Sequence, residues 1–271
     1  MSVQTVPYAQ NPDAAVAGLF ADSAPKRIAS VLVEAAIAPG LVVVHGSTTK
    51  TEGRPPVAPT AAPTAIVATG GASAATAQTI SGSALNGAVG QGPIVPAKNI
   101  TLVLSSSTDW DATTAVITGE NEDGEIITES LAIPNNGNVT VTGTIPFAKV
   151  TSILIPAQTG TGGTFTVGTG VILGSIDSIV HGISLYDASR EPGTWPVDGA
   201  MPVAQQGVVW VEAENAVNPS LPVFVRFVAS GDELLGNVRS AADSTDCGRL
   251  RKARWLDTTS EAGFARLAIN L

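Results

Sequence analysis

Apolar and polar residues alternate along several short segments of the chain, as they do in β-strands that bury one face. The alternation is clearest over 100–104, 114–119 and 125–133, where Val, Ile and Leu alternate with Thr, Ser and Glu. Gly, Asn and Pro separate such segments, and Asp123-Gly124 predicts a tight hairpin turn between two of them. The pattern predicts an all-β protein built from short strands and turns.

A second set of strands is predicted after residue 175. Residues 207–213, which contain Trp210, and residues 219–227 have strand character and are joined by Pro- and Gly-rich turns. Residues 254–256 and 264–271 supply two further strands. No nucleophile motif, metal-ligand spacing or phosphate-binding loop occurs in these segments. We therefore expect them to form a structural framework.

The predicted strands fall into two groups of different composition. Residues 25–49 and 175–271 are expected to form one discontinuous β-domain, a small barrel or sandwich. Within it, 26–34 alternates and Leu41–Val44 is an apolar run expected to be buried on both faces; we interpret the two as a hairpin. Residues 93–172 are expected to form an inserted, Ig-like antiparallel β-sandwich, because surface loops tolerate insertions.

Two segments have compositions that do not support a core of their own. Residues 1–24 are polar and rich in Pro and Ala, which predicts an extended N-terminal arm. Residues 50–92 carry a run of prolines followed by Gly, Ala, Ser and Thr, which predicts a linker. We expect 1–24 and 49–92 to become ordered only through partners.

Charge narrows the range of functions. The 271-residue chain has a formal net charge of -9, which argues against nucleic-acid binding because phosphate contacts need clustered Lys and Arg. Residues 93–172 contain two lysines, Lys98 and Lys149, and seven carboxylates, so the insert alone carries a net charge of -5. The single cysteine, Cys247, excludes an internal disulfide. We predict no cofactor.

Targeting signals are not evident. The first ten residues show neither the basic region nor the apolar stretch of a secretory signal. No apolar run approaches the roughly 18 residues of a membrane span. We expect a soluble protein made in a reducing cytoplasm, without contact with a membrane.

Candidate interface residues lie in two places. Arg249, Arg251, Lys252 and Arg254 form a basic cluster, which is either a solvated loop or a docking patch for an acidic partner surface. Trp195 lies in a turn-rich segment, where it is either a core residue or an exposed anchor for a partner.

Candidate catalytic or metal-binding residues are few. His45 and His181 each precede a glycine and could approach one another, but no third ligand is evident, so ordinary hydrogen bonding is favoured over a zinc site. Asp109, Asp111 and the acidic run 120–125 could bind calcium or act as paired carboxylates, although the run lacks the EF-hand spacing. We predict no metal site and no catalytic residue.

Four segments carry a resemblance to a known family. Gly182–Asp187, Trp195–Val203, Gly207–Glu212 and Ala253–Ile269 resemble the structural cement (capsid decoration) proteins of tailed bacteriophages. The resemblance covers the C-terminal part of the chain together with the strands before Thr49, and the insert resembles the small β-sandwich modules of phage virion proteins. Residues 217–220 depart from the pattern, because they lack the glycine that the family has before its last paired strand.

The resemblance implies a function. It implies a non-enzymatic virion protein on the outer capsid surface that binds the major capsid protein and clamps adjacent capsomers, often as a homotrimer. An alternative is a tail or fibre adhesion module that binds host-surface glycan through the inserted sandwich. A third hypothesis, a carboxylate-dependent hydrolase, places catalysis on Asp109 and Asp111.

Overall fold

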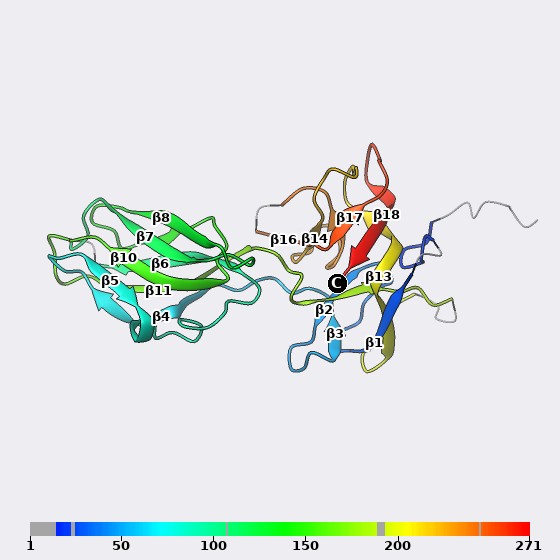
Figure 1. Ribbon diagram of the computed structural model, residues 1–271, viewed down its shortest axis with the longest axis horizontal. Coiled ribbons are helices and arrows are strands. Elements are labelled where there is room, and N and C mark those ends of the chain that lie inside the picture. The colour runs from blue at the N-terminus through cyan, green and yellow to red at the C-terminus, as the bar shows by residue number, and fades with distance from the viewer. Residues whose placement is uncertain (1–14, 23–24, 107, 189–192, 244) are drawn as a thin grey trace, which may run out of the picture.

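Two β-rich lobes lie at opposite ends of an elongated molecule (Figure 1). The computed structural model describes residues 15–22, 25–106, 108–188, 193–243 and 245–271. One lobe is a sandwich of two four-stranded sheets, and the other contains a single ten-stranded sheet. These sheets confirm the expected all-β class and the inserted antiparallel sandwich.

A closed barrel of five strands forms the centre of the second lobe. The strands are β1 (Arg27–Val33), β2 (Val42–His45), β3 (Glu52–Arg54), β12 (Val180–Ser184) and β13 (Ala200–Ala213). The ring runs β1-β3-β2-β12-β13 and closes through antiparallel pairing of β13 with β1. Alternate residues point inward, so Val31, Val33, Val43, Met201 and Val203 fill the barrel.

Pairing within the barrel corrects one prediction. β1 and β2 were expected to form a hairpin, but β3 lies between them and runs parallel to β1. The prediction failed because three residues of β3 are too short to show periodicity. The prediction for β2 is confirmed: Val43 packs inside the barrel, whereas Val42 and Val44 pack in the neighbouring core.

The ten-stranded sheet extends beyond the barrel through the long strand β13. Its other strands are β14 (Phe224–Arg226), β15 (Val238–Arg239), β16 (Cys247–Arg249), β17 (Ala253–Trp255) and β18 (Gly263–Asn270). Gln206–Ala213 pair with β18, which also pairs with β17. Trp255, Leu267 and Val225 bury a second core between these strands and the barrel wall.

The sandwich lobe buries its own core. One sheet has the order β5 (Gln78–Ser81), β10 (Lys149–Ile155), β7 (Thr113–Glu120) and β8 (Ile126–Ile133). The other has the order β4 (Ala62–Ala72), β11 (Thr164–Leu173), β6 (Lys98–Ser105) and β9 (Thr140–Thr142). Trp110, Phe147 and Phe165 lie between the sheets among aliphatic side chains.

The expected linker over 50–92 requires correction. It contains β3, β4 and β5, and a short 3₁₀ helix at Gly82–Ala84. Ile66 and Val67 of β4 lie in the sandwich core. Composition concealed β4 because Ala, Thr and Gly make up most of it, and β3 and β5 are only three and four residues long. Sheet pairing orders β4 against β11 and β5 against β10.

The described part of the N-terminal arm is also held by its own chain. Gly18 and Ala21 donate backbone hydrogen bonds to the carbonyls of Trp210 and Val208, both at 2.8 Å. Phe20 forms an antiparallel bridge with Val209, so the arm continues the line of β1 along β13. The rest of the expected arm, 1–14 and 23–24, lies outside the described residues.

Candidate functional site

The basic cluster lies on the turn between β16 and β17, on the barrel lobe. Leu250 anchors the turn: it is buried, and its N–H donates to the Val223 carbonyl at 2.9 Å. The Asp177 carboxylate accepts hydrogen bonds from the backbone N–H groups of Arg251 and Lys252, at 2.9 and 3.3 Å. A buried leucine and a carboxylate therefore present four exposed cations on a fixed turn.

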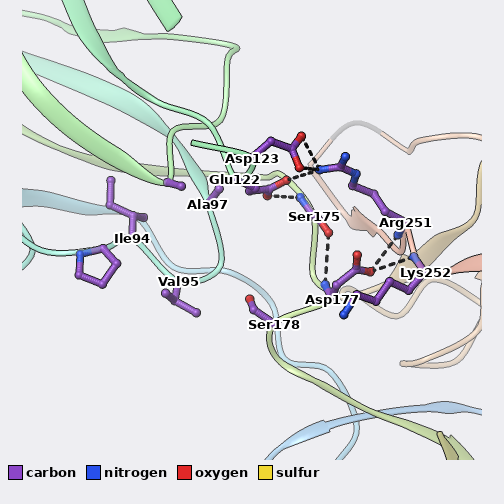
Figure 2. A pocket seen from close by; sticks show the side chains of 12 residues that line it. Ile94, Val95, Ala97, Glu122, Asp123, Ser175, Asp177, Ser178, Arg251 and Lys252 are labelled. Atoms are coloured by element: carbon purple, nitrogen blue, oxygen red, sulfur yellow. Dashed lines mark hydrogen bonds and ion pairs between the residues drawn. The ribbon is translucent and has the colours of Figure 1, made fainter. Parts of the chain in front are cut away.

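The four cations have different roles. Arg251 reaches the sandwich, where its guanidinium donates to Asp123 at 2.9 Å and lies 3.8 Å from Glu122 (Figure 2). Arg249, Lys252 and Arg254 make no ion pair with any described residue. We name these three residues the basic strip.

A cavity of about 610 Å³ opens where the two lobes meet at Arg251. Figure 2 shows the acidic turn of the sandwich on one side and Arg251 with Lys252 on the other. The Glu122 carboxylate also accepts a hydrogen bond from the Ser175 N–H. Burial raises the pKa of Glu122 above its usual value. Most of the charge in this cavity belongs to Glu122, Asp123 and Arg251, whose contacts join the two lobes.

Of the two roles left open for Trp195, a core residue or an exposed anchor for a partner, the structure supports the core residue and not the candidate interface. Its side chain is buried inside the barrel beside Ile37 and Met201. The indole N–H donates to the Leu185 carbonyl at 3.0 Å. Because the indole is enclosed and hydrogen-bonded within its own chain, Trp195 serves as a core residue.

The two histidines do come together. His45 ends β2 and His181 lies on the paired strand β12, and their ring centroids are 4.3 Å apart. The His181 Nε2 lies 2.9 Å from the Glu52 carbonyl oxygen. Burial is the main cause that lowers both pKa values. Among the described residues no group of three or more His, Cys, Asp or Glu is placed to hold a metal ion.

The candidate carboxylates of the sandwich, Asp109 and Asp111, accept hydrogen bonds from nearby loop residues. Asp111 accepts hydrogen bonds from the N–H of Thr159, at 2.6 Å, and from its hydroxyl, at 2.7 Å. Asp109 accepts from the Gly162 N–H at 3.2 Å and from the Ser106 hydroxyl. These bonds are the main cause that lowers both pKa values. Both carboxylates accept hydrogen bonds from the loop before β11, and Asp109 accepts another from Ser106, so both hold loops of the sandwich in place.

The acidic run 120–125 forms the expected hairpin turn. Asn121 organises it, because its side-chain oxygen accepts the N–H groups of Asp123 and Glu125, both at 2.9 Å. Gly124 adopts φ 79°, a left-handed conformation that favours glycine. All three aromatic residues of the sandwich are buried, so the lobe exposes no aromatic platform for a sugar. Glycan binding by the sandwich stays a prediction.

A buried ion network was missed by sequence reasoning. Arg226 is fully buried on β14 and donates to both Glu214 carboxylate oxygens, at 2.6 and 2.7 Å. Arg239 and Asp243 join the network at 2.8 to 3.2 Å, and Glu233 also pairs with Arg226. Burial raises the pKa of the adjacent Cys247 thiol to about 11. The only sign of this network in the sequence was a charged residue, Arg226, between the apolar residues Val225 and Phe227.

Over the described residues, the molecule is thus an all-β protein in which no group of three or more His, Cys, Asp or Glu is placed to hold a metal ion. The chain belongs to the family of structural cement proteins (E217 gp24/Pam3 gp6), whose profile matches residues 122–270. The match begins inside the sandwich, so the family pattern includes part of that lobe. This membership identifies a structural protein of the phage virion that associates with the capsid.

Two further findings concern curated sequences and membrane spans. No curated protein sequence matches the chain. None of the helices in the described part of the chain is long and apolar enough to cross a membrane.

Proposed function

We propose that the protein binds the outer surface of a phage capsid, contacts the major capsid protein and stabilises neighbouring capsomers without enzymatic activity. The observation that carries this proposal is the family match over 122–270. The hydrogen bonds that lower the pKa of Asp109 and Asp111 support the non-enzymatic role, because they keep both carboxylates ionised and make them poorer proton acceptors.

The basic strip is the surface that we assign to the shell. A chain of net charge -9 keeps three cations here without a described carboxylate partner. Lys252 and Arg254 also line a groove of about 430 Å³ with Val208 and Ile269. Unpaired cations beside an apolar groove favour an acidic partner segment, because complementary charge steers association and fixes orientation.

Reconstitution of phage heads tests both the role and the surface. We expect heads that lack this protein to release DNA at a lower temperature, and added protein to restore the resistance. The variant R249A/R254A should bind heads more weakly and with a smaller salt dependence. The variant K50A/K149A removes two exposed cations elsewhere and serves as the control. Equal heat resistance with and without the protein would refute the proposed role.

We further propose self-association as a homotrimer. Ile28 and Leu32 lie on the outer face of β1 and are 53% and 44% exposed. Exposed apolar residues gathered on one face favour contact with another copy. Light scattering on the purified chain should give the trimer mass, and I28S/L32S should lower it. A monomer at all concentrations, with and without heads, would contradict the trimer.

A further inference from the structure

A second cavity between the lobes, of about 390 Å³, has an unusual charge composition. Its walls come from β2 and β3 of the barrel, from the connecting segment 57–60, and from Val95, Pro96 and Lys98 at the base of the sandwich. His45, Arg54 and Lys98 line it, and no Asp or Glu does. In a chain with 23 acidic residues and 14 Lys and Arg, such a lining calls for a physical account.

Lys98 is the least compensated of these groups. Its ammonium donates to the Thr60 carbonyl at 3.1 Å and forms no ion pair with a described residue. Burial lowers its pKa. A partly buried ammonium without a counter-ion is unfavourable, because desolvation is not repaid by a paired charge. An anion in the cavity would supply that charge.

Arg54 extends the same cationic wall, and His45 adds an imidazole ring beside it. The Arg54 Nε donates to the His45 carbonyl at 3.3 Å. Its terminal nitrogen lies 3.9 Å from the Glu34 carboxylate, which is already bonded to the Ser47 N–H at 2.6 Å. The guanidinium therefore keeps donors for a further acceptor.

The rest of the lining is apolar. This part of the wall consists of uncharged apolar side chains, those of Val57, Val95, Ile179 and Phe227. A ligand that fills this cavity therefore needs an anionic end and an apolar end.

We propose that this cavity binds a small organic oxyanion, a phosphate or carboxylate attached to an apolar group. The anionic end would lie among Lys98, Arg54 and His45, and the apolar end against Val57, Val95 and Phe227. Because Lys98 and Val95 belong to the sandwich side and Arg54 and His45 to the barrel, the bound ligand joins the two lobes.

Thermal shift and calorimetry on the full chain test the proposal with three probes. We expect phenyl phosphate to bind more tightly than inorganic phosphate, because only the first covers the apolar wall. Benzoate as the third probe distinguishes a preference for carboxylate from one for phosphate. Binding should weaken at least about tenfold in K98M and R54M.

Lys149→Met is the matched control, since Lys149 is the other lysine of the sandwich and lies 3.6 Å from Glu120 at the surface. K98M should fold well, because it removes a partly buried charge, so loss of binding would not reflect unfolding. The proposal is overturned if no probe binds below about 10 mM. Equal binding by wild type, K98M and K149M would overturn it as well.

Discussion

Single residues of this protein show how burial decides the role of a charged or aromatic side chain. Arg226 ends β14 and Arg251 lies on the turn after β16; the first is fully buried in a network and the second is exposed at the lobe junction. Trp195 lies in a turn-rich segment and Trp210 in a strand, yet Trp195 is the one enclosed in the barrel, whereas Arg266 lies over the Trp210 ring at 5.9 Å. Residue type alone does not separate these cases.

The Arg226 network predicts a large effect on stability. Arg226→Met leaves the Glu214 carboxylate, which is 2% exposed, without its main partner. Breaking a buried pair costs about 3–5 kcal/mol, because one charge stays buried, and here it keeps only the Arg239 contact at 3.1 Å. Urea unfolding measures the loss. Arg266→Met breaks a pair whose arginine is 42% exposed and should cost below about 1 kcal/mol; equal losses would contradict the argument.

The histidine pair predicts a dependence on pH. Both pKa values are lowered in the folded state from the ordinary 6.5. As the pH falls through about 6.5, the unfolded chain binds protons more readily than the folded chain, so the free energy of unfolding decreases. Lys50 adds to the effect at His45, since its positive charge also opposes protonation.

Unfolding between about pH 7.5 and about pH 5.5 measures this effect. H45Q/H181Q should show a flatter dependence than wild type. Glu122, whose raised pKa acts in the opposite direction, is common to both proteins and does not disturb the comparison. Identical slopes would show that the pair does not titrate as argued.

At the scale of elements, pairing partners explain what periodicity could not. β7 and β8 were predicted because their alternation is regular and Asp123-Gly124 marks the turn, and they pair along their whole length. β4 was hidden among Ala, Thr and Gly, and it forms a strand because β11 supplies its hydrogen-bond partners. Short β3 depends in the same way on β1 and β2.

The burial of β4 predicts a large effect for Ile66→Ala, and Ile126→Ala on β8 of the same lobe serves as the exposed comparison. Ile66→Ala removes a fully buried side chain and should cost about 2–5 kcal/mol. Ile126→Ala, at a position 79% exposed, should change stability by less than about 0.5 kcal/mol. Urea unfolding compares them. Rapid proteolysis within 62–72 of the free protein would contradict the place of β4 in the sandwich core.

At the scale of the whole molecule, the lobes are joined by charge as well as by two connecting segments. The acidic turn of the sandwich meets Arg251 and the N–H of Ser175, and the second cavity lies between the same lobes. The basic strip and the junction therefore share one turn of the chain. Attachment to a shell through the strip would be coupled to the orientation of the sandwich.

Arg251→Ala predicts looser lobes with little loss of stability. The Arg251–Asp123 pair is about half exposed, so its removal should cost below about 1 kcal/mol. Small-angle X-ray scattering should show a larger radius of gyration or a broader distance distribution. Raised salt should produce the same change in wild type, because exposed pairs are screened, and Lys149→Ala should not. An unchanged scattering profile in R251A would refute the coupling.

The sequence by itself determined the all-β class, a discontinuous β-domain that is a small barrel or sandwich, and the inserted sandwich, because side-chain alternation and turn residues act locally. It also brought the basic cluster and the cement resemblance into view. Only the tertiary structure decided that Trp195 is core and Arg251 a lobe contact, that Arg226 is buried among carboxylates, and that residues 50–92 pair into sheets. Those outcomes depend on partners far away in the chain, which no local pattern records.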